Sequence, residues 1–185
     1  MAGSLLGTAV RRVEDPELLT GRGTYVGNLP IEGLLHVAFV RSPLAHAVVT
    51  GIDTSEAAAA PGVVAVYTAS DIDLPAHHGL MPVNPEIPRP PLATDRVRFV
   101  GEVVAMIVAE SKAAAVDAVE LVEVDYDPLD AVVDPEEALE AGAPLAFPER
   151  GTNLTTGLRS GGADPLDGAD VVVRARMVNQ RLAVV

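Results

Sequence analysis

Two closely spaced glycines, Gly21 and Gly23, could begin a loop that binds a dinucleotide. That fingerprint needs a third glycine three residues after the second, a strand before the loop and a helix after it. Position 26 is Val, Gly27 comes one residue late, and residues 18–20 are too short for the preceding strand. We therefore interpret these glycines as residues of tight turns.

The adjacent histidines His77 and His78, with Asp71 and Asp73 nearby, could hold a metal ion. Side chains of adjacent residues diverge, and no third ligand follows at helical or zinc-finger spacing. We interpret this segment as a solvated loop.

An acidic stretch over residues 120–134 could bind calcium or magnesium. It lacks the spacing and the glycine of an EF-hand loop. Most of its carboxylates alternate with apolar residues, which is typical of the solvated face of a strand. The stretch consists of Glu120, Glu123, Asp125, Asp127, Asp130 and Asp134.

Ser42, with His46 four residues later, could be a nucleophile with its base. The glycines of a nucleophile elbow are missing around Ser42, and Pro43 follows it directly. His36 and His46 stand within strand patterns, where a hydrogen-bonded structural role is the simpler interpretation. The residues thus predict no catalytic, cofactor-binding or metal-binding side chain in this chain.

Composition argues against several classes of function. The 185 residues carry a net charge of −13, which argues against binding to nucleic acids or anionic membranes. No apolar run approaches 18 residues, and residues 1–20 lack the pattern of a secretory signal, so we expect a cytoplasmic protein. Cysteine is absent, which excludes disulfides and iron–sulfur ligation by this chain.

Short strands and short helices would position these side chains. Apolar and alternating runs predict strands over 34–41, 47–53, 63–68, 97–109 (broken at Gly101-Glu102), 122–126 and 170–178. Helices are predicted over 56–60 after Thr54 and Ser55, over 112–121 after Ser111, and from Asp134 onward.

The remaining segments are expected to be irregular. Glycine and proline predict an extended arm without a helix over the first thirty residues, a proline-rich loop over 71–91 and an irregular stretch over 142–168. The fold class is mixed α/β (α+β). We expect strands 34–41 and 47–53 to be neighbours in one sheet that combines parallel and antiparallel pairs.

Five blocks of this sequence resemble, in order and spacing, the start of a known family of large subunits. That family comprises the molybdopterin-binding subunits of xanthine dehydrogenases, aldehyde oxidases and aerobic carbon monoxide dehydrogenases. The blocks are Arg12–Val26, Leu34–Ala47, Pro61–Val66, Leu92–Glu102 and Val119–Leu129.

The resemblance implies an α/β hammerhead domain. It divides the chain into an arm (1–33), the hammerhead domain (34–145), and an irregular linker with a strand (146–185) leading into the molybdopterin-binding domain. The family's cofactor loops and its general-base glutamate lie beyond this stretch, so the resemblance carries over no catalytic residue. We expect the chain alone to be inactive and to bind no cofactor, whereas the full-length family enzyme binds molybdopterin.

The resemblance also implies partners. They are the molybdopterin-binding remainder of the large subunit, and iron–sulfur and FAD subunits or domains. Because the sequence stops at Val185, we expect a truncated or separately encoded domain, with an exposed apolar face that could pair with a second copy. The alternative is a free-standing binding or scaffold protein that kept the fold without oxidoreductase activity.

Two further expectations concern substrates. By resemblance, the loop over 74–91 would line the substrate channel of a full-length enzyme, or be a plain surface loop. Val103 and Val184 stand where the family commonly has proline, and Leu44 where it often has histidine. These departures leave the substrate branch open.

Overall fold

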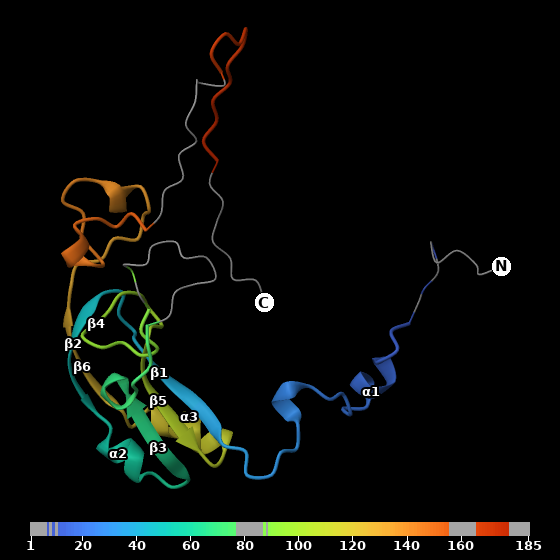
Figure 1. The fold of residues 1–185 in the computed structure, drawn as a ribbon. Coiled ribbons are helices and arrows are strands. Elements are labelled where there is room, and N and C mark those ends of the chain that lie inside the picture. Colours follow the sequence, from blue (N-terminus) through green and yellow to red (C-terminus); the bar gives the residue numbers. More distant parts are fainter. Residues whose placement is uncertain are drawn as a thin grey trace.

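The computed structural model describes residues 7, 9, 11–76, 87, 89–155 and 166–177. In this part of the chain, the strands form two small sheets of three strands each (Figure 1). The helices are short, with five to eight residues. The predicted mixed α/β class with short helices is therefore confirmed.

The first sheet has β5 (Val103–Ala109) at its centre, between β1 (His36–Arg41) and β3 (Val63–Thr68). Both pairings are antiparallel. Since β5 is hydrogen-bonded on both edges and is apolar along its whole length, it forms the middle of the core. Ala105 and Ile107 are fully buried there.

The second sheet has β2 (Ala47–Asp53) at its centre, between β4 (Arg96–Val97) and β6 (Glu123–Pro128). Ala47 and Val97 face each other across the β2–β4 pair and are fully buried. Val104 of β5 packs in the same apolar cluster. The two sheets thus share one continuous apolar interior.

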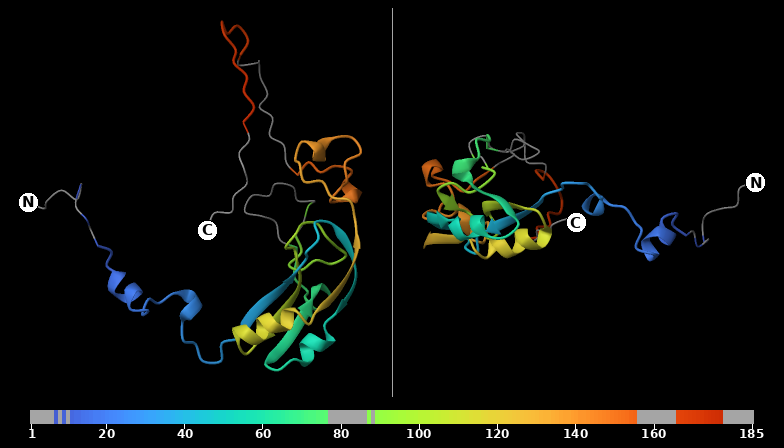
Figure 2. Two further views of the ribbon diagram at one scale, coloured as in Figure 1. Left: turned by 180° about the vertical axis from the view of Figure 1, so that it is seen from behind. Right: turned by 90° about the horizontal axis from the view of Figure 1, so that it is seen from below.

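Two helices close the core of the first sheet. In α3 (Lys112–Val119), Ser111 is the N-cap, as predicted, and its hydroxyl accepts a hydrogen bond of 3.1 Å from the Ala114 amide. Ala118 on this helix packs with Ala57 of α2 (Ser55–Ala59) and with Ile107. Figure 2 (left), turned by 180° from Figure 1, shows α3 lying across this sheet.

The prediction of an arm without a helix is wrong. The segment Asp15–Leu19 forms the helix α1, with Pro16 in the first turn, where its missing N–H costs no hydrogen bond. Thr20 ends the helix, and its hydroxyl donates a 2.6 Å hydrogen bond to the Pro16 carbonyl. The glycines break the pattern only after this turn, and the arm runs away from the sheets in Figures 1 and 2.

Two predictions of topology are also wrong. Strands β1 and β2 lie in different sheets, because residues 43–46 form a bend and each strand pairs with segments distant in sequence. All four strand pairings among the described residues are antiparallel, so no parallel pair is formed there.

The C-terminal third differs from its prediction in two places. The helix expected from Asp134 is a single 3₁₀ turn, Glu137–Leu139, and the Asp134 carboxylate accepts a 2.7 Å hydrogen bond from the Glu136 amide just before that turn. The strand predicted over 170–178 is absent from its described part, residues 170–177. Val171 and Val173 are both exposed, and no strand pairs with this segment in the described structure.

The proline-rich loop lies largely outside the described residues, because positions 77–86 and 88 are not described. His77 and His78 therefore have no structural account. A 3₁₀ turn, Ala69–Asp71, begins the loop, with the Asp71 carboxylate accepting hydrogen bonds from the amide and hydroxyl of Thr68, both 2.7 Å long. Among the described residues, no helix is long and apolar enough to cross a membrane.

Candidate functional site

The structure does not gather the sequence candidates into one site. His36 is half-buried at the start of β1, and Ser42 and His46 flank the bend between the two sheets. The carboxylates Glu123, Asp125 and Asp127 are exposed along β6, as the alternating pattern predicted. No group of three or more potential metal ligands is present in the described part of the chain.

The Ser42 side chain is hydrogen-bonded within the bend. Its hydroxyl accepts a 3.0 Å hydrogen bond from the Leu44 amide and donates one of 2.9 Å to the Leu44 carbonyl. This local pattern closes the turn around Pro43. Burial raises the pKa of the Tyr126 phenol, and a hydrogen bond with Ser42 opposes that rise.

The connection between β4 and β5, at Gly101 and Glu102, is fastened to the same bend. The Ser42 amide donates to the Glu102 carbonyl at 2.9 Å, and the Gly101 amide donates to the Ser42 carbonyl at 2.8 Å. Gly101 has a φ of +89°, a left-handed conformation that favours glycine. The Glu102 carboxylate accepts a hydrogen bond from the Arg98 amide. These hydrogen bonds therefore fix the position of the Arg98 backbone.

His46 joins the other side of the bend to the end of β6. Its Nδ1 atom lies 2.9 Å from the Asp130 carbonyl, which can only accept, so Nδ1 carries the proton. The His46 carbonyl in turn accepts from the Leu129 amide at 2.9 Å. Nε2 is buried without a hydrogen-bond partner among the described residues. The prediction of a structural histidine is thus supported at Nδ1, whereas Nε2 is unsatisfied.

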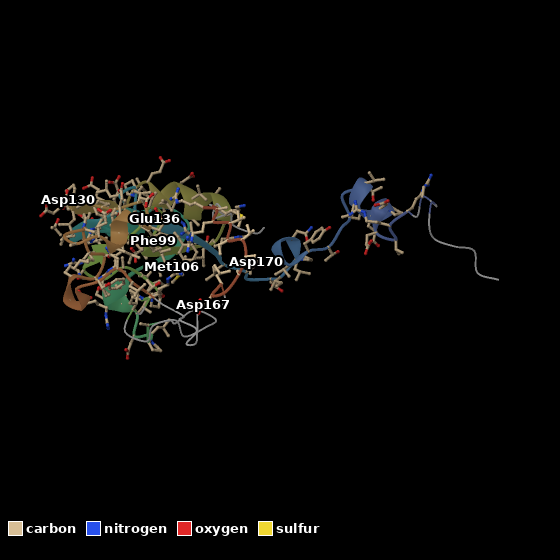
Figure 3. The ribbon with its side chains drawn as sticks, turned by 90° about the horizontal axis from the view of Figure 1, so that it is seen from above. Phe99, Met106, Asp130, Glu136, Asp167 and Asp170 are labelled. Atoms are coloured by element: carbon tan, nitrogen blue, oxygen red, sulfur yellow. The ribbon has the colours of Figure 1, made fainter. Side chains whose placement is uncertain are left out.

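A cavity of about 220 Å³ is lined by Ala45 and His46 and by residues from three other segments, which meet only in the folded chain. Arg98, Phe99 and Val100 follow β4, and Asp130 to Val133 follow β6. Pro144 and Ala146 come from the C-terminal third. Phe99 and Asp130 are labelled in Figure 3.

Arg98 is the central side chain beside this cavity. Its guanidinium lies 4.4 Å from the centroid of the Phe147 ring, and its Nε donates a 3.0 Å hydrogen bond to the Ala146 carbonyl. The Arg98 side chain is 14% exposed. A desolvated guanidinium stacked on a ring and bonded to a carbonyl holds the two segments together strongly.

Asp95 is the acidic partner of Arg98 and Arg96. Its carboxylate lies 3.8 Å from Nη2 of Arg98 and 3.3 Å from Nε of Arg96. Partial burial opposes ionisation of Asp95, but hydrogen bonds from Thr94 and Arg96 and the charge of Arg98 hold its pKa below the ordinary value. The carboxylate is 62% exposed, so the Coulomb attraction is screened by water.

Asn153 fastens the loop that carries Ala146. Its Nδ2 donates to the carbonyls of Ala138 (3.0 Å) and Pro144 (2.8 Å), while its Oδ1 accepts from the Ala146 amide at 3.0 Å. One side chain thus satisfies three backbone groups in a segment without regular structure.

We name five of these residues the Arg98 corner: Arg98, Phe147, Asn153, His46 and Glu102. Sequence reasoning missed Arg98, Phe147 and Asn153. An arginine inside the apolar run 97–109 was the available signal for Arg98, since a cation within a buried strand pattern needs a partner. No local pattern marks Asn153 or Phe147.

Neither the glycines Gly21 and Gly23 nor Arg98 is arranged to hold a phosphate-bearing cofactor such as molybdopterin. Gly21 and Gly23 follow the short helix α1 rather than a strand. A Cβ atom on Gly23 would lie 2.8 Å from Cδ2 of Leu18, so this glycine makes room for the chain's own side chain. Arg98, the most enclosed cation of the corner, is committed to Ala146, Phe147 and Asp95.

Comparison with known proteins identifies this fold. The family model of the aldehyde oxidase and xanthine dehydrogenase a/b hammerhead domain matches residues 20–130. The nicotine 6-hydroxylase large subunit of Paenarthrobacter nicotinovorans is 44% identical over 156 residues, which are 82% of this chain and 19% of that relative. The carbon monoxide dehydrogenase large chain of Afipia carboxidovorans is 45% identical over 140 residues, which are 76% of this chain and 17% of that relative.

Solved structures agree. Reconstituted CO dehydrogenase from Oligotropha carboxidovorans superposes with a TM-score of 0.64 at 44% identity, over 75% of this chain and 17% of that chain. Quinoline 2-oxidoreductase from Pseudomonas putida 86 gives 0.62 at 44% identity, over 74% and 18%. The chain thus spans about a fifth of the length of the curated relatives above.

The match to the family model extends over more than half of the chain, from Thr20 to Asp130. It contains both sheets and α3, and it ends at Asp130, the first residue of the cavity-lining segment that follows β6. The chain therefore belongs to the a/b hammerhead domain family of aldehyde oxidases and xanthine dehydrogenases.

Proposed function

We propose that this chain is a non-catalytic structural domain of a molybdenum-cofactor hydroxylase large subunit. In that role it supports the molybdopterin-binding domains and shapes the substrate channel. The observation that carries the proposal is the match of residues 20–130 to the hammerhead domain, in relatives of which this chain spans about a fifth.

The side chains of the Arg98 corner support a structural role. Arg98, Asn153 and the Nδ1 atom of His46 bind the chain's own backbone carbonyls. Side chains engaged in this way are suited to holding a rigid shape, whereas a reaction requires groups that reach a substrate.

The proposal assigns the chemistry to the rest of the enzyme. One relative, from Escherichia coli O157:H7, is named as a xanthine dehydrogenase molybdenum-binding subunit and is 33% identical over 141 residues. In our proposal the cofactor is held by the remainder of the large subunit, and iron–sulfur and FAD partners carry the electrons. Residues 1–33 form an arm, 34–145 the domain and 146–185 the connection.

A domain exchange tests this function. The stretch of the Paenarthrobacter nicotinovorans large subunit that matches this chain would be replaced by the corresponding stretch of this chain. We expect the chimera to retain molybdenum and hydroxylation of nicotine, and the isolated chain to have neither. The same chimera carrying Ile107→Asp, which places a carboxylate in the core, is the control that must lose both.

Two results would contradict the proposal. One is molybdenum bound to the purified isolated chain. The other is a chimera that does not assemble although circular dichroism shows the isolated chain folded. The second result would favour a free-standing scaffold protein.

A further inference from the structure

The first sheet has one apolar face that its helices do not cover. Because directly paired residues of antiparallel strands point to the same face, the register defines this surface. Val37 and Ala65 both pair with Val108, and Phe39 and Tyr67 both pair with Met106. We name it the open face: Val37, Phe39, Ala65, Tyr67, Met106 and Val108.

The helices lie on the opposite side of the same sheet. Ala57 of α2 and Ala118 of α3 pack with Ala105 and Ile107, which alternate with the open-face residues along β5. Figure 2 (left) looks at the sheet from the side of α3, and Figure 1 looks from the side of the open face, where Met106 lies at mid-sheet.

The open face is most exposed along β1. Val37 is 50% exposed and Phe39 is 42% exposed, whereas Ala65, Tyr67, Met106 and Val108 are partly buried. Contiguous apolar residues on adjacent strands differ from scattered ones, since together they mark a surface that another protein segment covers.

Arg41 gives the open face a polar rim. It follows Phe39 by two residues, its guanidinium lies 5.5 Å from the Phe39 ring centroid, and Nη1 donates a 2.9 Å hydrogen bond to the Gly101 carbonyl. A guanidinium has five N–H donors, so it retains capacity for an acceptor on a partner.

Charge and chain length decide between possible occupants. A second copy would bring two chains of net charge −13 together, which Coulomb repulsion opposes. About four-fifths of the length of the relatives above lies outside their match to this chain, in the same polypeptide. A covalently linked segment has a high effective concentration, so weaker contacts are enough for it to occupy the face.

We propose that the open face is the surface on which the remainder of the large subunit packs, with apolar side chains over β1 and β5 and a carbonyl or carboxylate oxygen at Arg41. This inference rests on the proposed function and adds which surface makes the contact.

The test compares two valines of equal exposure on opposite sides of the sheet. Val37 on the open face is 50% exposed, and Val116 on α3 is 52% exposed. Val37→Asp and Val116→Asp would each be made in the isolated chain and in the chimera described above. Thermal unfolding of the isolated variants gives the intrinsic cost of each aspartate.

In the chimera, docking would be measured by hydrogen exchange of the β1 amides and by the fraction of protein that retains molybdenum. We expect β1 exchange to be slower in the chimera than in the isolated chain. Val37→Asp should weaken docking by about tenfold or more, which is the contribution of one buried valine. This loss comes in addition to any destabilisation that the same substitution causes in the isolated chain. Val116→Asp should add no such shift.

The outcomes separate the two proposals. If the unsubstituted chimera assembles but Val37→Asp behaves as Val116→Asp and β1 exchange is unchanged, the open face is not the contact surface, and the proposed function stands. If the chimera fails to assemble around a folded domain, the proposed function fails and this inference with it. If light scattering shows a dimer of the isolated chain that Val37→Asp dissociates, a second copy is the occupant and the inference is overturned.

Discussion

Removing the Arg98 side chain should release residues 131–155 from the sheets. In Arg98→Ala, the Ala146 carbonyl loses its charged donor at 3.0 Å and the Phe147 ring loses its stacked cation at 4.4 Å. Residues 131–155 contain no strand and only short 3₁₀ turns, so no strand pairing joins them to the sheets.

The magnitude follows from these contacts. A hydrogen bond from a charged donor contributes about 1.5–3 kcal/mol, and a cation over a ring contributes about 1–2 kcal/mol when it is largely desolvated. The ion pair with Asp95 adds at most about 1 kcal/mol, because that carboxylate is exposed. Such terms are not additive, and we expect a local loss of about 2–4 kcal/mol, a change of about 30- to 1000-fold in the opening equilibrium.

Hydrogen exchange of the Ala146 amide is the direct assay, because this amide is bonded to Asn153 Oδ1 within the segment that would open. The exchange rate of the Ala146 amide should increase by the predicted factor, while the exchange rates of the β5 amides should stay unchanged. Arg96→Ala is the matched control, since Arg96 pairs with the same Asp95 but makes no side-chain hydrogen bond to residues 144–147. Equal exchange of Ala146 in both variants would refute the assignment of Arg98 as the anchor.

Three further changes have defined outcomes. Ile107→Ala, at a fully buried site in β5, should lower the free energy of unfolding in urea by about 2–5 kcal/mol, and Ile107→Val by about 0.5–1.5 kcal/mol; equal losses would contradict the cavity argument. Ser111→Ala should cost about 1 kcal/mol by removing the acceptor for the Ala114 amide, whereas Ser111→Asp should be close to neutral in the same assay. Hydrogen bonds from the amide and then the hydroxyl of Thr68 lower the pKa of Asp71 below 3.8, so its stabilising contribution is present above that pH and is lost as the pH falls through the folded-state pKa. An NMR titration of Thr68 should show this transition in the natural chain and lose it in Asp71→Asn; a transition that persists in the variant would assign it to another group.

The sequence by itself determined elements whose signals are local. Strands over 47–53 and 63–68 have the predicted bounds, and Ser111 caps its helix as predicted, because alternation, β-branched residues and a capping hydroxyl act within a few residues. The resemblance of five ordered blocks identified the hammerhead fold. The expectation that this chain carries no catalytic, cofactor-binding or metal-binding residue stays a prediction.

Only the tertiary structure decided how these elements are paired. Strands β1 and β2 are neighbours in sequence but lie in different sheets, since Gly101 and Glu102 fasten the bend at Ser42 to a segment about sixty residues away. The segment 170–177 has the pattern of a strand but pairs with no strand among the described residues, because a strand needs a partner that its own pattern cannot provide. Arg98 and Asn153 acquire their roles in the same way. Their partners are backbone carbonyls, which every residue has, so only the folded path of the chain determines which carbonyls they bind.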